Sequence, residues 1–155
     1  MDIETRLQRV ESLERIRCLK AHYCDLCDEG YDADALTALF TPDAVWDGGD
    51  LGCFEGRDRI HKFFAQMPNA MSFAIHHITN SAIQLSDDGQ QATARWYLLQ
   101  TATLSATNQA VWLAGRYDDD LVMDGDDWKF RRVAIKTRFF TPHEEGWAQT
   151  PVLAL

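Results

Sequence analysis

Residues 91–104 read QATARWYLLQTATL, a stretch in which apolar and polar side chains alternate. One set is predicted to face inward: Ala92, Ala94, Trp96, Leu98 and Ala102. Thr93, Arg95 and Thr101 fall between them, as in a strand that buries one face and turns the other toward solvent or a second subunit. The pattern therefore predicts a long strand of an antiparallel sheet.

Three more stretches share this character, because β-branched and aromatic side chains are frequent in residues 72–85, 110–123 and 128–140. Short segments of turn-forming composition separate the four stretches, at residues 86–89, 105–108 and 124–127. The second half of the chain is therefore predicted to be a four-stranded antiparallel meander.

The first half has a helical period instead. From Ile3 to Leu26 apolar residues recur every three or four positions, which predicts one face of a long amphipathic helix that ends near Gly30. A short helix is expected over 33–40 and a third helix after Gly56, and two short strands are expected between them, at residues 44–46 and 52–54. Helices followed by a sheet indicate an α+β fold, and we expect residues 1–155 to form a single domain.

Composition and charge exclude several classes of partner. The 155 residues are 46% hydrophobic, and 24 acidic against 15 basic residues give a net charge of −9. Such a chain repels nucleic acid and anionic membranes. The N-terminus lacks the basic and apolar segments of a signal peptide, and no stretch is long enough to span a bilayer. We expect a cytoplasmic protein without a nucleic-acid or membrane partner.

No metal or nucleotide cofactor is expected. Cys24 and Cys27 form a C-x-x-C, but it falls late in a predicted helix and no second pair completes a zinc site. Cys18 and Cys53 are expected to be buried thiols. The run 118–120 lacks the spacing of a calcium loop, so these aspartates are predicted to be a solvated strand end. No glycine-rich phosphate motif is present.

Short motifs in a fixed order span nearly the whole chain: Asp43-Ala44-Val45-Trp46, Phe54-Glu55-Gly56-Arg57, His76-His77-Ile78-Thr79-Asn80, Gly115-Arg116-Tyr117-Asp118-Asp119 and Gly125-Asp126-Asp127-Trp128-Lys129-Phe130. Together they resemble the SnoaL-like family of the nuclear transport factor two-like superfamily. The resemblance implies a cone-shaped α+β barrel, in which helices cover a strongly curved, mainly antiparallel sheet. It also implies a small-molecule pocket between the long helix and the concave face of the sheet.

The resemblance extends to the residues of a site. In dehydratase-like members a helix aspartate and a strand histidine remove a proton from the substrate, and these positions match Asp28 and His76. Tyr23 matches a pocket tyrosine of one member, and Gln100 stands where that member has an aspartate. The substrate-binding residues are expected to be Trp46, Trp96, Gln100 and Arg138, with Arg131 and Arg132 as alternatives to Arg138 for the arginine of the last strand.

Elementary chemistry supports these roles. A neutral imidazole is the best side-chain base near neutral pH, and a carboxylate can orient it and stabilise its protonated form. A phenol such as Tyr23 can donate to a developing oxyanion. His76 and His77 are adjacent, so a strand turns them to opposite faces, and alternation alone does not decide which of them enters the pocket.

The expected function is therefore a lyase of the dehydratase type that acts on a hydrophobic cyclic molecule such as a polyketide, steroid or terpenoid. An isomerase or cyclase that uses the same pocket is an alternative, and so is a non-catalytic ligand-binding or dioxygenase small-subunit-like module. Aromatic residues on the outer sheet face predict a homodimer or homotrimer.

Overall fold

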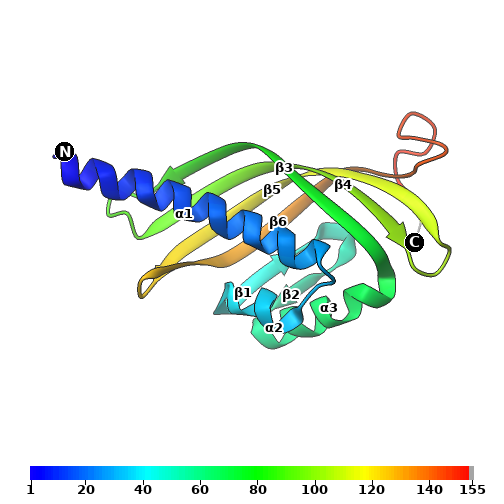
Figure 1. Cartoon of the computed structure of the whole chain (residues 1–155), viewed down its shortest axis with the longest axis horizontal. Helices are drawn as coiled ribbons and strands as arrows, with labels where there is room; N and C mark the ends of the chain where they lie inside the picture. The colour runs from blue at the N-terminus through cyan, green and yellow to red at the C-terminus, as the bar shows by residue number, and fades with distance from the viewer. Residues whose placement is uncertain (154–155) are drawn as a thin grey trace.

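The computed structural model describes residues 1–153, in which three α-helices pack on one six-stranded sheet (Figure 1). The helices are α1 (Ile3–Asp28), α2 (Ala33–Ala38) and α3 (Arg57–Ala70), and a 3₁₀ turn, η1, spans Gly49–Leu51. The strands are β1 (Phe40–Asp47), β2 (Cys53–Glu55), β3 (Met71–Leu85), β4 (Gln91–Leu104), β5 (Gln109–Asp124) and β6 (Asp127–Pro142). The predicted α+β class and the meander of four long strands are confirmed.

The sheet has the order β2-β1-β6-β5-β4-β3, and all its neighbours are antiparallel except β1 and β6. The short helix predicted over 33–40 is two residues too long, because Phe40 already belongs to β1 and pairs with Phe130 of β6. Arg57, at the start of α3, donates to the carbonyl oxygen of Phe40. The first strand is therefore held both by the sheet and by a helix.

Irregular pairing curves the long strands. The register of β5 against β6 skips Arg131 and Arg138, and the register of β3 against β4 breaks between Thr79 and Ala82. Such bulges bend a strand and increase its twist. At Gly115, opposite the second break, an added Cβ would lie 2.8 Å from the carbonyl oxygen of Lys136, so only glycine permits this approach. The resulting arch is visible in Figure 1.

Helix α1 lies across the concave face of the sheet and contacts β3 most extensively (Figure 1). Its buried residues are Ile16, Lys20, Tyr23, Cys24 and Cys27. The predicted apolar face is therefore correct only in the second half of the helix, since Ile3, Leu7 and Val10 in its first half are exposed. The apolar period continues there, but no segment within residues 1–153 covers it.

The cysteines are divided between interior and surface. All four are free, and Cys24 and Cys27 are buried in the core. Cys18 and Cys53 are exposed, so the prediction that they are buried is wrong. Cys18 falls on the outward side of α1, and Cys53 begins the short edge strand β2.

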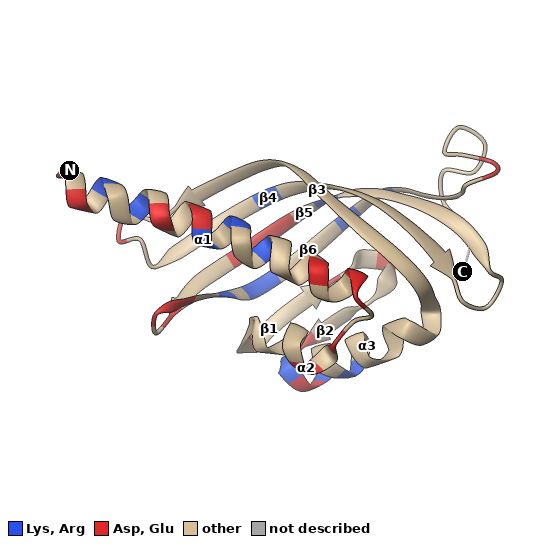
Figure 2. Cartoon of the chain, in the orientation of Figure 1, with Lys and Arg blue, Asp and Glu red and all other residues tan. Residues whose placement is uncertain are grey.

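Charged side chains are unevenly distributed. Lys, Arg, Asp and Glu recur along α1, whereas β3 carries none of them over its whole length (Figure 2). No helix within residues 1–153 combines the length and the apolar character needed to cross a membrane. The part of the chain that the structure describes also contains no group of three or more His, Cys, Asp or Glu side chains suited to a metal ion.

Candidate functional site

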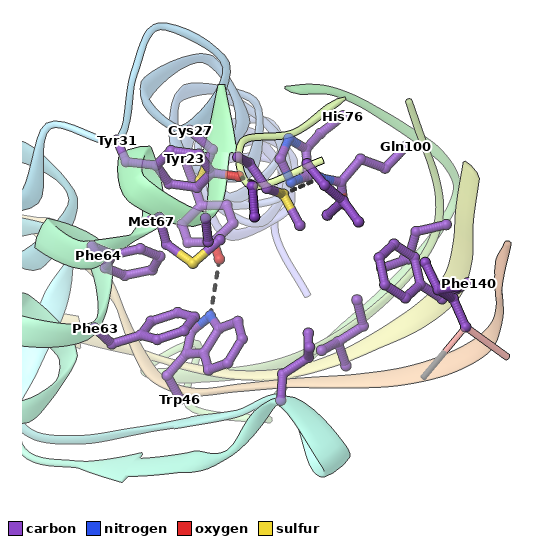
Figure 3. A pocket seen from close by; sticks show the side chains of 18 of the residues that line it. Tyr23, Cys27, Tyr31, Trp46, Phe63, Phe64, Met67, His76, Gln100 and Phe140 are labelled. Atoms are coloured by element: carbon purple, nitrogen blue, oxygen red, sulfur yellow. Dashed lines mark hydrogen bonds between the residues drawn. The ribbon is translucent and has the colours of Figure 1, made fainter. Parts of the chain in front are cut away.

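A cavity of about 500 Å³ lies between α1, α3 and the concave face of the sheet. Most of its wall is aromatic or aliphatic, with Trp46, Phe63, Phe64 and Phe140 among the larger side chains (Figure 3). The C-terminal segment contributes as well, because the backbone of residues 151–153 bonds to Phe140 and places Leu153 in the wall. The polar lining is sparse and consists of Tyr23, Tyr31, His76, Gln100, Thr107, Gln109 and Tyr117.

His76 and Asp28 form a hydrogen-bonded pair at the wall. The Nδ1 of His76 lies 2.5 Å from Oδ1 of Asp28, and the backbone N–H of His76 donates to both carboxylate oxygens at 3.1 and 3.0 Å. The His76 side chain is 6% exposed and that of Asp28 is 22% exposed. His76 lines the cavity and Asp28 does not, so the carboxylate lies behind the imidazole.

This arrangement determines which nitrogen of His76 can act as a base toward the cavity. An ionised carboxylate only accepts hydrogen bonds, so the short contact places a proton on Nδ1. In the neutral imidazole Nε2 is then unprotonated and carries the lone pair of a base. Asp28 is also the last residue of α1, where a negative charge opposes the helix dipole. The backbone N–H and the ring of His76 compensate for that charge.

The neighbouring histidine points the other way. His77 is exposed, whereas His76 shares its face with Ala74 and Ile78, which are buried or half-buried. On β4 the residue directly opposite His76 is Gln100. Strand pairing therefore places an imidazole and an amide side by side in the wall.

Gln100 is buried, and its side-chain amide makes only one weak hydrogen bond within residues 1–153. Its Nε2 donates to Sδ of Met71 at 3.7 Å, and the Tyr31 hydroxyl donates to the same sulfur at 3.9 Å. A thioether is a weak acceptor. Both donors can therefore turn to a stronger acceptor on a bound molecule.

Tyr23 is fixed by Trp46. The indole Nε1 of Trp46 donates to the Tyr23 hydroxyl oxygen at 3.0 Å, as the dashed line in Figure 3 shows. Burial raises the pKa of Tyr23 well above its ordinary value, so the phenol keeps its proton. Because the oxygen accepts from Trp46, the O–H is free to donate. Tyr23 and Asp28 are five residues apart, and the cavity and β3 lie on the two different sides of α1 that this spacing requires.

Two predicted substrate contacts lie elsewhere. Trp96 is on the concave face but outside the lining of this cavity, and its Nε1 donates to Asp119 at 3.0 Å. Arg138 is exposed and is the extra residue of a bulge. Arg131 is exposed at the other bulge and Arg132 pairs with Asp47 at 2.8 Å. None of the three arginines lines the cavity, because the bulges break the alternation that would turn them inward.

A buried ion pair lies beside the cavity and was not predicted from the sequence. Lys20 Nζ lies 2.8 Å from Oδ2 of Asp119, and both side chains are almost completely buried. The prediction that Asp119 is a solvated strand end is therefore wrong. Burial raises the pKa of Asp119, and the Lys20 ammonium and the Trp96 N–H oppose that rise. The available signal was the position of Lys20, which follows Ile16 by four residues and precedes Tyr23 by three on the buried face.

Comparison with known proteins agrees with this architecture. The SnoaL-like domain family matches residues 8–134. An uncharacterized protein of Mycobacterium tuberculosis is 32% identical over 106 residues, which cover 66% of this chain and 71% of that protein.

Solved structures with related folds include two from Novosphingobium species. A scytalone dehydratase-like protein of Novosphingobium aromaticivorans has a TM-score of 0.81 and 22% identity, with 88% of this chain and 90% of that chain covered. A hexachlorocyclohexane dehydrochlorinase of Novosphingobium barchaimii has a TM-score of 0.79 and 21% identity, with 88% and 93% covered. At these identities the likeness establishes the fold. The SnoaL-like family match extends over most of the length of this chain, so the chain belongs to the SnoaL-like domain family.

Proposed function

We propose that this protein is a lyase that eliminates water or another leaving group from a hydrophobic cyclic small molecule, with His76 as the base. The observation that carries the proposal is the Asp28–His76 pair, which turns an imidazole toward a largely apolar cavity and holds its other nitrogen at 2.5 Å from a carboxylate. A base, an orienting group and a largely apolar cavity are elements that favour proton abstraction from carbon.

The reaction balances with these residues alone. Nε2 of His76 takes a proton from the carbon next to a carbonyl group, and the electron pair of the broken C–H bond moves onto the carbonyl oxygen to give an enolate. The enolate re-forms the carbonyl, a C=C bond forms, and the C–O bond to a β-hydroxyl breaks. The departing hydroxide takes the proton from His76 and leaves as water. The imidazole is then neutral again.

Asp28, Tyr23 and Gln100 each have a defined place in this scheme. Asp28 keeps Nδ1 protonated and stabilises the imidazolium while the proton is on His76. Tyr23 donates to the oxygen that becomes negative, and the hydrogen bond from Trp46 strengthens that donation. Gln100 lies opposite His76 and can bind a further oxygen of the substrate.

The substrate class follows from the cavity. A volume of about 500 Å³ is in the range of small-molecule sites, and the lining is mainly aromatic and aliphatic. Polyketide, steroid and terpenoid rings have this mixture of apolar surface and few oxygens. The dehydrochlorinase and dehydratase-like structures of the same fold support elimination as the reaction class.

The test is deuterium incorporation from heavy water into a panel of cyclic β-hydroxy-ketones and enones, read by mass spectrometry. We expect exchange or water loss with the wild-type protein and a fall of about 10²- to 10⁴-fold in His76→Ala, the range for loss of a general base. His77→Ala is the matched control and should react like the wild type, because His77 is exposed.

A second variant separates chemistry from binding. Asp28→Asn should lower the rate strongly with little change in substrate affinity, since the imidazole loses its orienting charge while the cavity keeps its shape. Turnover that survives in His76→Ala would exclude this histidine as the base. Label that returns to a different carbon, without loss of water, would indicate an isomerase with the same base.

A further inference from the structure

We propose that Tyr117 is a second phenol donor of the site and binds the oxygen atom on which negative charge develops, with the buried Lys20–Asp119 ion pair as its support. This inference rests on the proposed function and extends it by a residue of β5, Tyr117, whose ring neighbours that of Tyr23 on α1. It also narrows the substrate to molecules that present a carbonyl-type oxygen to the inner wall of the cavity.

Tyr117 has the position that this role requires. It lies in β5, pairs with Trp96 of β4 and Ile135 of β6, and lines the cavity. Its side chain is buried, with 3% of the residue exposed. Strand alternation places it on the concave face, which α1 covers.

Its hydroxyl group has no hydrogen-bond partner among the described side chains and backbone groups of residues 1–153. Three side-chain polar atoms in that part of the chain are fully enclosed without a partner: Thr41 Oγ1, Asp119 Oδ1 and Trp128 Nε1. The Tyr117 hydroxyl is not one of them, so its oxygen retains some accessible surface, and Tyr117 is among the residues that line the cavity.

The hydroxyl groups of the other two cavity tyrosines each have a hydrogen-bond partner. The oxygen of Tyr23 accepts from Trp46, and the hydroxyl of Tyr31 donates to Met71. A phenol without a partner in an apolar cavity costs free energy, because it has lost its hydrogen bonds to water. A substrate oxygen that accepts from Tyr117 removes that cost only in the complex.

The ion pair beneath the ring makes this phenol a stronger donor. Lys20 Nζ lies 3.5 Å from the centroid of the Tyr117 ring, and 4.8 Å from that of Tyr23. A cation over an aromatic face is attracted by the ring electrons, most strongly where water is excluded. It withdraws electron density from the ring, and hence from the O–H bond, while Asp119 balances the charge at 2.8 Å from Lys20.

The phenol stays a donor at neutral pH. Burial raises the pKa of Tyr117 well above its ordinary value, with the surrounding thiols and Asp119 acting in the same direction. The Tyr23 and Tyr117 rings are neighbours, with centroids 6.5 Å apart in an edge-to-face arrangement. Two adjacent phenols therefore line the same cavity.

The test uses 1-tetralone carrying ¹³C at its carbonyl carbon as the probe ligand. Infrared difference spectra of the complex report hydrogen bonding to the carbonyl oxygen as a shift of its stretching band to lower frequency. In Tyr117→Phe the ring and its contact with Lys20 remain, and we expect the band to move back to higher frequency and the dissociation constant to rise about tenfold. The matched control is Tyr97→Phe, which removes a hydroxyl from the exposed sheet face and should change neither.

A double variant tests the ion pair. Lys20→Met combined with Asp119→Leu removes both charges, leaves no buried charge unpaired and keeps the Tyr117 hydroxyl. We expect a band between those of wild type and Tyr117→Phe. If the double variant shows the wild-type carbonyl band, the ion pair has no part in the role of Tyr117. If Tyr117→Phe leaves both the band and the affinity unchanged, the proposed role of Tyr117 is wrong.

These outcomes are independent of the elimination chemistry. His76→Ala should keep the wild-type carbonyl band while it loses deuterium exchange. If the wild-type protein shows no exchange but Tyr117→Phe shifts the band, the proposed lyase function fails and the role of Tyr117 in oxygen binding stands.

Discussion

At the residue scale, Lys20 shows how strongly burial changes the role of a charged side chain. A lysine on a helix usually reaches solvent, but Lys20 lies three residues before Tyr23 and is enclosed with Asp119 and Trp96. A buried ion pair contributes little net stability, yet removing one partner leaves an uncompensated charge in the interior. The pair therefore makes the protein sensitive to either single substitution.

We predict that Lys20→Met lowers the free energy of unfolding by about 3–5 kcal/mol, the cost of leaving a buried carboxylate unpaired. Urea unfolding followed by far-ultraviolet circular dichroism measures the change. Arg17→Met, one turn earlier on the exposed side of α1, is the control and should change stability by less than about 0.5 kcal/mol. Equal stabilities of the two variants would contradict the burial of the Lys20 charge.

At the scale of elements, the β1–η1–β2 hairpin supplies Trp46, the residue whose hydrogen bond positions the Tyr23 hydroxyl. Trp46 lies near the end of β1, its ring packs on Phe63 of α3 with centroids 4.3 Å apart, and its indole N–H reaches Tyr23. The turn that follows passes directly under the indole. A Cβ on Gly48 would lie 2.5 Å from Cζ3 of Trp46, so a residue without a side chain is required there.

We predict that Gly48→Ala displaces the Trp46 ring, breaks its hydrogen bond to Tyr23 and destabilises the chain by about 1–3 kcal/mol, as overpacking does. The indole N–H resonances of the five tryptophans provide the measurement, and that of Trp46 should move. Asp50→Ala changes an exposed residue in the same turn and is the control. An unmoved Trp46 resonance in Gly48→Ala would show that the backbone of the turn shifts to make room for the Cβ while the Trp46 ring stays in place.

At the scale of the whole molecule, the core around the cavity is rich in weak acids that are held protonated. Burial raises the pKa values of Tyr23, Tyr31 and Tyr117, and it raises that of Cys24 to about 12 and that of Cys27 well above its ordinary value. In the unfolded chain the same groups ionise from about pH 9 upward. The unfolded state therefore loses protons that the folded state retains.

We predict that the protein keeps its full stability at neutral pH and loses it as the pH rises above about 9, because the folded pKa values lie above the unfolded ones. Each such group that is ionised only in the unfolded chain lowers the free energy of unfolding by about 1.4 kcal/mol per pH unit. Urea titrations between about pH 7 and pH 11 test this slope, and Tyr117→Phe should reduce it. A free energy of unfolding that is flat over this interval would contradict the burial of these groups.

The convex face of the sheet is the surface on which we expect subunits to associate. Phe73 and Ile75 of β3 and Tyr97 and Leu99 of β4 are exposed there. The expectation of a homodimer or homotrimer stays a prediction, and this apolar surface is its physical basis.

The sequence by itself determined the order of helices and strands, the α+β class and the alternation of the long strands, because these depend on local periodicity and turn residues. Resemblance to a family singled out Asp28, His76 and Tyr23, which the structure brings to one end of α1 and the facing strands. Only the tertiary structure decided that His76 faces inward rather than His77, since two adjacent strand residues are equivalent until one face of the sheet is covered. The same holds for Lys20 with Asp119, which are 99 residues apart, and for Arg138, which a bulge turns away from the cavity. Long-range pairing and bulges depend on how distant segments pack together, and no local pattern encodes that packing.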